Sequence, residues 1–227
     1  MRTAATAPSP RTHRPILAPQ TSALLCALAL ALLQAAAPVQ AAEKAAGKVA
    51  EKAGATPVTA GSNASCPATL DFRFPRLQDE APQNLCQYAG KVVLVVNTAS
   101  YCGFTPQYQG LEALHARYSA RGLVVLGFPS NDFEQEADSA KEIADLCYNT
   151  YGVRFPMLAK SHVRGDKANP MYALLARQSG TAPKWNFHKY LIDRNGKVVA
   201  NYPSKVAPDN AELVSRIEQL LSQPGQR

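Results

Sequence analysis

Beyond residue 90 the hydrophobic and polar positions follow two patterns in alternation, one typical of buried strands and one typical of helices. Residues 91–97 contain five consecutive aliphatic side chains, which is typical of a strand buried on both faces of a sheet. Thr105 and Pro106 follow, and they suit the N-cap and the first position of a helix. Apolar residues then recur at helical spacing, at Leu111, Leu114 and Tyr118. The pattern predicts a strand, a turn and a helix.

The same alternation continues to the end of the chain. A second strand is predicted at 123–128, and the Ser139 and Glu142 pair forms a capping box that starts a helix reaching Tyr151. Asn169 and Pro170 start another helix. The remaining predicted elements are a strand at 187–192, a turn at 193–196, a strand at 197–202 and a helix from near Asp209.

This order of elements predicts the fold class. A strand–helix–strand unit followed by a helix, a hairpin and a closing helix is the order of an α/β thioredoxin-like fold. We expect one such domain at residues 66–223, with a central mixed β-sheet flanked by helices and a short tail at 224–227.

The first 65 residues have a different character. Basic residues at Arg2, Arg11 and Arg14 precede an apolar run at 23–37, and small residues at 39–41 resemble a cleavage site. This pattern predicts a signal peptide at 1–41 and an exported, periplasmic protein, with an uncleaved anchor as the alternative. Residues 42–65 are rich in Ala, Lys, Glu and Gly and are expected to be flexible.

Charge adds little to this picture. The chain has 24 Lys and Arg and 17 Asp and Glu, and without the three arginines of the leader the excess is 21 − 17 = +4. No basic stripe with interleaved aromatic residues is present, so the sequence does not favour a nucleic-acid partner.

The four cysteines beyond the leader fall into two pairs. Cys66 and Cys86 flank a segment that lies before the first long strand, and we expect a structural disulfide between them. Cys102 and Cys147 lie inside the strand and helix pattern. The sequence has no C-x-x-C, and no Cys or His spacing indicates a metal site or any bound cofactor.

Cys102 is the candidate nucleophile. It lies on the turn between the strand at 91–97 and the helix expected at Thr105, where unpaired backbone N–H groups and the helix dipole favour a thiolate. The alternative is a buried cysteine without a chemical role. Cys147, inside a predicted helix, has the same alternative as an ordinary core cysteine.

Four segments closely resemble the glutathione peroxidases, and in particular their two-cysteine, thioredoxin-dependent members. They are residues 95–105 (VVNTASYCGFT), 126–133 (LGFPSNDF), 151–157 (YGVRFPM) and 184–189 (KWNFHK). The resemblance implies that Cys102 is the peroxidatic cysteine, with Gln135, Trp185 and Asn186 as hydrogen-bond donors to the peroxide, and that Cys147 is the resolving cysteine. Ser130 and Asp132 stand where many members have Cys and Gln, and the placement of Gln135 requires a gap of one residue.

The resemblance also implies an activity. It indicates a thiol peroxidase that reduces hydrogen peroxide and organic hydroperoxides through a sulfenic acid on Cys102 and a disulfide to Cys147. A thioredoxin-like dithiol or glutathione is the expected reductant. The segment between Met157 and Lys184 is short, which favours a monomer. A thioredoxin-type thiol:disulfide exchanger and a peroxide sensor that relays oxidation to a partner remain the alternatives.

Overall fold

The strand predicted at 91–97 lies in the middle of the sheet. The computed structural model describes residues 66–224, so the expected signal peptide at 1–41 and the flexible segment at 42–65 lie outside the described residues. Strand β3 (Val92–Thr98) pairs in parallel with β4 (Leu123–Pro129) and antiparallel with β5 (Lys189–Ile192). Strand β6 (Val198–Tyr202) pairs antiparallel with β5, which gives a mixed sheet of order β4-β3-β5-β6.

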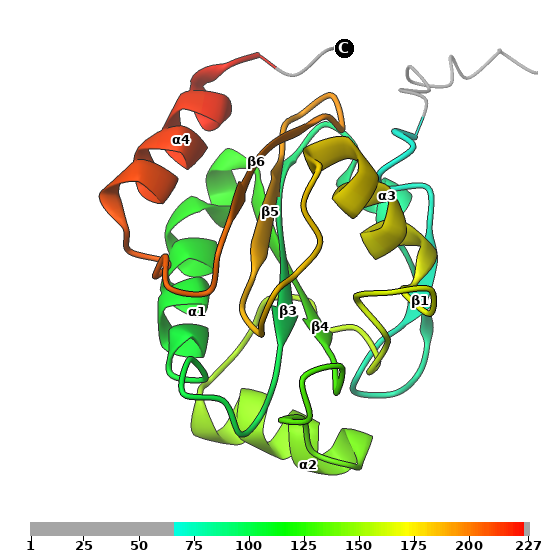
Figure 1. The fold of residues 1–227 in the computed structure, drawn as a ribbon. Coiled ribbons are helices and arrows are strands. Elements are labelled where there is room, and N and C mark those ends of the chain that lie inside the picture. Colours follow the sequence, from blue (N-terminus) through cyan, green and yellow to red (C-terminus); the bar gives the residue numbers. More distant parts are fainter. Residues whose placement is uncertain (1–65, 225–227) are drawn as a thin grey trace, which may run out of the picture. The chain divides into compact units, whose positions relative to one another are not determined.

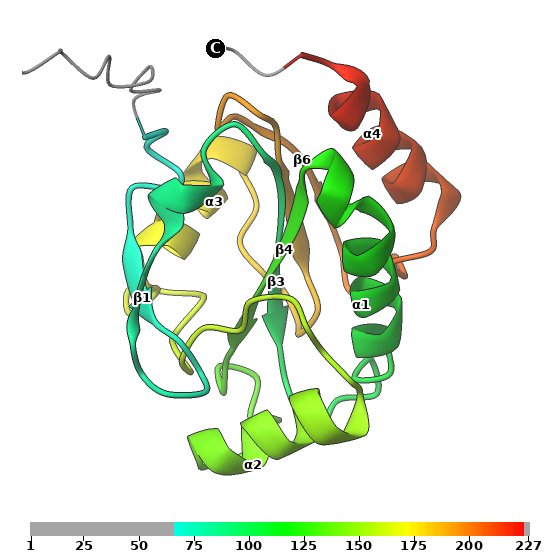
Figure 2. The same cartoon turned by 180° about the vertical axis from the view of Figure 1, so that it is seen from behind.

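Helices cover both faces of this sheet. Helix α1 (Gln107–Tyr118), which continues into η2 (Ser119–Arg121), and helix α4 (Ala211–Ser222) lie on one face. Helix α3 (Pro170–Ser179) lies on the other (Figures 1 and 2). The result is the α/β thioredoxin-like arrangement predicted from the sequence.

Two apolar cores follow from this layering, because successive side chains of a strand point to opposite faces. Val92, Leu94 and Val96 of β3 pack with α1 and α4 in one cluster. Val93 and Val95 pack with α3 in the other. All five valine and leucine side chains are fully buried, as the uninterrupted aliphatic run predicts.

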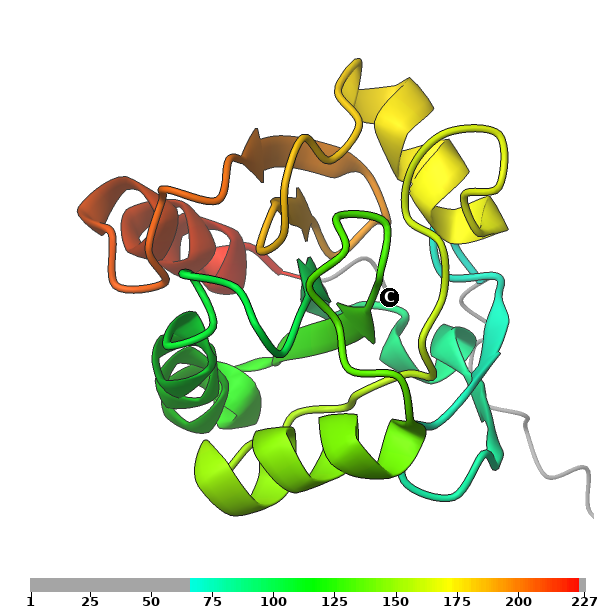
Figure 3. The same cartoon turned by 60° about the horizontal axis from the view of Figure 1, so that its bottom comes forward.

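Helix α2 (Ala140–Ala144) lies across the end of the sheet where β3 and β4 finish (Figure 3). The predicted capping box is present, because Ser139 accepts the backbone N–H of Glu142 and the Glu142 side chain reaches back to the N-cap residue. The helix continues as η3 (Asp145–Thr150), in which the backbone widens to a π-helix. This wide turn, which the sequence analysis did not anticipate, contains Cys147.

The last two helices begin at or close to their predicted positions. Helix α3 begins as expected, with Asn169 as N-cap and Pro170 at its first position. Helix α4, however, is capped by Asn210, whose side chain accepts the N–H groups of Glu212 and Leu213, and Asp209 lies outside the cap. No helix of the described part of the chain combines the length and apolar character needed to cross a membrane.

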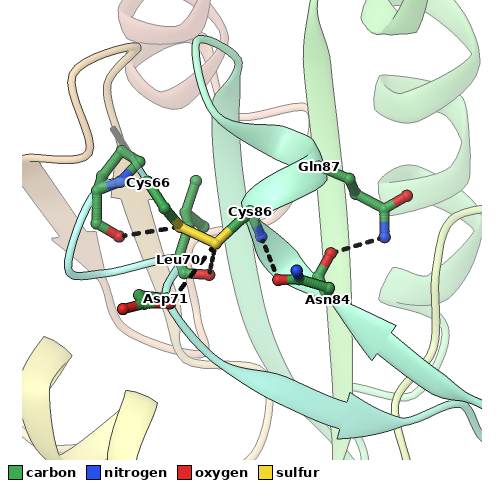
Figure 4. The surroundings of a disulfide bond; sticks show 7 residues. Cys66, Leu70, Asp71, Asn84, Cys86 and Gln87 are labelled. Atoms are coloured by element: carbon green, nitrogen blue, oxygen red, sulfur yellow. Dashed lines mark hydrogen bonds between the residues drawn. A yellow bond between two sulfur atoms is a disulfide. The ribbon is translucent and has the colours of Figure 1, made fainter. Parts of the chain in front are cut away.

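The segment before β3 is a small hairpin, β1 (Arg73–Pro75) with β2 (Pro82–Asn84), followed by the short helix η1 (Leu85–Tyr88). A disulfide joins Cys66 to Cys86 of η1, with an S–S distance of 2.05 Å (Figure 4). It ties the beginning of the described chain to the element that precedes β3. Asp71 lies beside Cys86, and these three residues are the one close group of potential metal ligands within residues 66–224. Two of the three, Cys66 and Cys86, are joined to each other in the disulfide.

Candidate active site

Cys102 lies in a tight turn after β3. Its side chain is only 7% exposed, and its carbonyl accepts the N–H of Thr105 at 2.9 Å. The backbone N–H of Phe104 points at the Cys102 sulfur, with an N···S distance of 3.4 Å. This donor and the tight turn fix the position of the Cys102 sulfur, which suits it to act as a nucleophile.

Thr105 supports this turn and does not cap a helix, contrary to the prediction. Helix α1 begins at Gln107, preceded by Pro106 with helical backbone angles and no side-chain cap. The Thr105 hydroxyl accepts the N–H of Cys102 at 3.1 Å and donates to the carbonyl of Ala99 at 2.9 Å. The threonine therefore joins the two sides of the Cys102 turn, because its side chain bonds backward along the chain and not forward into the helix.

Gln135 reaches the same turn from the loop after β4. Its backbone carbonyl accepts the N–H of Tyr101, the residue next to Cys102, at 2.8 Å. Glu134, which precedes it, has a φ of 57°, in the left-handed region that side chains rarely adopt. Its N–H donates to the carbonyl of Asn131 at 3.0 Å, so the chain makes a tight turn directly before Gln135.

Asn186 approaches from the segment before β5. Its side chain is fully buried, and its Nδ2 donates to Oε1 of Gln135 at 3.0 Å. Asn97, near the end of β3, fixes this segment by donating to the carbonyl of Trp185 at 3.1 Å. The structure therefore brings Gln135 and Asn186 into direct contact beside the Cys102 turn.

Trp185 is not a core residue. Its side chain is 41% exposed and packs against Phe133, with 5.4 Å between the ring centroids. Tyr101, next to Cys102 in the chain, is 69% exposed. These are the two large exposed apolar side chains of the described residues, and both flank a residue of the candidate site.

Cys147 lies in η3, is fully buried and shares a core cluster with Cys102. Both thiols are free. Burial raises the pKa of the Cys147 thiol to about 12, and the nearby Glu136 carboxylate contributes to this rise, whereas the Tyr108 hydroxyl opposes it. At neutral pH Cys147 is therefore a protonated thiol while η3 remains folded.

Glu136 is a buried acidic residue that is not among the site residues predicted from the sequence. Its Oε1 accepts the backbone N–H groups of Ser100 and Ala137, each at 2.9 Å, and also the Ser100 hydroxyl. Burial raises the pKa of the carboxyl, and the hydrogen bonds from Ser100 and Ala137 oppose that rise. An acidic residue next to Gln135 is the only sign of it in the sequence, since nothing local indicates that it is buried.

The arrangement suits attack by sulfur on an O–O bond. A thiolate is the nucleophile, and amide donors stabilise the oxygen that leaves.

Comparison with known proteins agrees with this geometry. Residues 71–176 match the family model described as glutathione peroxidase. A glutathione peroxidase-like peroxiredoxin of Schizosaccharomyces pombe is 49% identical over 152 residues, which cover 65% of this chain and 95% of the relative. A hydroperoxy fatty acid reductase of Synechocystis is 48% identical over 154 residues, covering 63% of this chain and 90% of the relative.

A solved structure shows the same likeness. The crystal structure of Trgpx in its apo form matches with a TM-score of 0.55 and 37% sequence identity, over 70% of this chain and 98% of that one. The fold, the motifs and the curated relatives lead to one conclusion: this chain belongs to the glutathione peroxidase family.

Proposed function

We propose that the protein is a thiol peroxidase that works through Cys102 and Cys147. The observation that carries the proposal is the convergence of two distant segments, those of Gln135 and Asn186, on the Cys102 turn. Within the turn, the Phe104 N–H points at the Cys102 sulfur. The Gln135 backbone carbonyl accepts the Tyr101 N–H, and the Asn186 side chain donates to the Gln135 side chain.

The first step is attack of the Cys102 thiolate on a hydroperoxide. The S–O bond forms as the O–O bond breaks, so sulfur loses two electrons and the peroxide gains them. The leaving alkoxide or hydroxide needs hydrogen-bond donors, which the Gln135 amide and the Trp185 indole N–H are suited to supply. The product is a sulfenic acid on Cys102 and an alcohol or water.

The second step is attack of Cys147 on this sulfenic acid. The S–S bond forms, the S–O bond breaks, and water leaves. An external dithiol then reduces the disulfide by exchange. A thioredoxin-like protein is the proposed reductant, since an intramolecular disulfide is the natural substrate of a dithiol, and glutathione is the second candidate.

The exposed side chains beside the site favour organic hydroperoxides as well as hydrogen peroxide. Tyr101, next to Cys102 in the chain, and Trp185, next to Asn186, offer exposed apolar surface. The name of the Synechocystis relative, a hydroperoxy fatty acid reductase, supports this choice of substrate class. We further propose that the protein acts in the periplasm as a monomer, from the leader pattern and the short 157–184 segment.

The test is peroxide turnover with a thioredoxin system and with glutathione. Wild type should turn over with the thioredoxin system, Cys102→Ser should be inactive, and Cys147→Ser should form a sulfenic acid yet lose thioredoxin-dependent turnover. Full activity of Cys102→Ser would refute the mechanism. A mixed disulfide with a partner protein that persists, with little turnover by any reductant, would favour the sensor instead.

A further inference from the structure

Arg164 lies on the same aromatic surface as Trp185. Its guanidinium carbon is 5.1 Å from the ring centroid of Phe133, and the Phe133 centroid is 5.4 Å from that of Trp185. The two distances together place the guanidinium carbon within about 10.5 Å of the Trp185 ring. An arginine is attracted to the face of an aromatic ring, and the exposed Arg164 side chain keeps its N–H groups open to a ligand.

Asp132 fixes the loop that carries Arg164. One oxygen of its carboxylate accepts the backbone N–H groups of Val163 and Arg164, at 2.6 and 3.1 Å, and the other contacts Nδ1 of His162 at 2.5 Å. Asp132 directly precedes Phe133 in the chain. One residue therefore anchors both the aromatic ring and the backbone of the arginine that packs on it.

Lys184 shares a cleft with Arg164. The cleft has a volume of about 550 Å³, in the range of small-molecule sites, and is lined by residues 164–165 of one loop and 180–184 of another. The Tyr190 hydroxyl donates to the carbonyl of Thr181 at 2.7 Å, which ties the second loop to β5. The lining contains no acidic residue, and neither cation forms an ion pair with a carboxylate within residues 66–224. The cleft therefore suits an anion.

The wall of this cleft leads directly to the candidate active site. Lys184 precedes Trp185, and Trp185 precedes Asn186, whose side chain donates to Gln135 at 3.0 Å. The backbone carbonyl of Gln135 in turn accepts the N–H of the residue before Cys102. Between the cleft and Cys102 the surface is thus first cationic and then apolar, at the exposed tryptophan. A molecule with a carboxylate at one end and an apolar chain behind it matches this order.

We propose that Arg164 and Lys184 bind the carboxylate of a fatty acid hydroperoxide, with its apolar chain over Trp185 and its hydroperoxide group at Cys102. The proposal rests on the thiol peroxidase function given above, for which it names a substrate class and the site that recognises it. Arg164 can hold a carboxylate through two parallel N–H bonds, and Lys184 adds a second positive charge. Peroxides without a carboxylate gain nothing from the two cations.

Fluorescence of Trp185 tests the binding directly, because it is the only tryptophan of the chain. Linoleate, which has the carboxylate but no hydroperoxide, is titrated into the full-length protein below its micelle concentration, with methyl linoleate as the neutral counterpart. We expect linoleate to bind about tenfold more tightly than the ester, which is the effect of one charge-assisted hydrogen bond. Arg164→Gln should remove most of this preference. Salt at about 1 M should also weaken it, since the Debye length is then about 3 Å.

Turnover provides a second measurement. kcat/KM is determined for linoleic acid hydroperoxide and for its methyl ester, and the acid-to-ester ratio should be about tenfold in wild type and fall toward one in an Arg164→Gln, Lys184→Gln double variant. Arg121→Gln is the matched control and should keep the ratio of wild type. It removes an exposed arginine next to Gly122, whose carbonyl accepts the N–H of Val92 at the opposite end of β3 from Cys102.

Several results would overturn the proposal. They are an acid-to-ester ratio near one in wild type, no response of Trp185 fluorescence to linoleate, and equal losses for acid and ester in the double variant, which would indicate a disturbed site. An unchanged ratio with a raised KM for the thioredoxin reductant would assign the two cations to the reductant instead. Failure of the peroxidase function is distinguishable: wild type would turn over neither hydroperoxide, while the linoleate titration would still decide whether the carboxylate site exists.

Discussion

Asn186 donates a hydrogen bond from Nδ2 to Oε1 of Gln135 at 3.0 Å, across 51 residues of sequence. The bond occupies the carbonyl end of the glutamine amide. The NH2 end is thereby oriented as a donor that the peroxide oxygen can use. In the proposed mechanism the Gln135 amide donates to the peroxide oxygen, and Asn186 acts by orienting that amide.

Gln135→Ala removes the side-chain amide and should lower kcat/KM for hydrogen peroxide by about 10²–10³, the usual effect of removing one such donor. Asn186→Ala should give a similar decrease, because Gln135 is then no longer oriented. The double variant should be little worse than either single variant, because the two residues act as a unit. Gln109→Ala, an exposed glutamine of α1, is the control and should retain full activity. Multiplied losses in the double variant would contradict a shared role.

The disulfide should stabilise the fold without affecting catalysis. It closes a loop with a sequence separation of 20, which corresponds to about 3 kcal/mol on the chain-entropy model. Cys86 precedes β3 and Cys102 follows it, so the seven-residue strand separates the two regions. Urea denaturation of a Cys66→Ala, Cys86→Ala double variant should show this decrease, with unchanged sulfenic acid formation at 25 °C. A large loss of activity in the folded variant would argue against a purely structural bond.

His188 should make the protein less stable below pH 6.5. Burial, with a smaller contribution from the charge of Lys189, lowers the pKa of this imidazole from 6.5 to about 4. The unfolded chain therefore binds more protons between these values, so stability is fully present above pH 6.5 and is lost as the pH falls toward 4. The shift corresponds to about 3 kcal/mol.

His188→Phe should reduce this pH dependence, which urea titrations at pH 7 and pH 4.5 would measure. Some loss of stability at low pH should remain in this variant, because burial also lowers the pKa of His115. Glu136 should act in the opposite direction: burial raises the pKa of its carboxyl, so its protonation favours the folded state as the pH falls. An identical decrease in the variant and in wild type would show that His188 is not responsible.

Gly127 of β4 should not tolerate a side chain. A Cβ at this position would lie 2.2 Å from Sδ of Met157 and 3.1 Å from Phe155. Gly127→Ala should therefore cost about 1–3 kcal/mol of unfolding free energy, as overpacking does in other cores. Combining it with Met157→Ala should destabilise by less than the sum of the single changes, because each relieves the other. Strict additivity would exclude this contact as the cause.

The sheet and its helices could be predicted because their signals are local. The aliphatic run of β3, the Ser139 capping box and the Asn169–Pro170 start each fix an element through neighbouring residues. Helix α4 begins within two residues of the predicted start near Asp209, and its exact cap, Asn210, depends on where the preceding loop ends, because Asn and Asp both cap helices.

The site was less accessible to sequence reasoning because its contacts follow no helix or strand pattern, and several of them join distant residues. Thr105 has the local signature of an N-cap, yet its hydroxyl is engaged by Cys102 and Ala99. Burial of Glu136 depends on how the loop after β4 packs against the Cys102 turn, which no periodicity reveals. The family resemblance supplied Gln135 and Asn186, whereas their mutual hydrogen bond required the structure.

The wide turn at Asp145–Thr150 also stores chain length. Six residues of helix span about 9 Å, whereas the same residues extended span about 20 Å. If this one turn melts while α2 stays capped by Ser139, the chain that carries Cys147 gains about 10 Å of travel. The chain that carries Cys147 can therefore lengthen while helix α2 and the sheet keep their places.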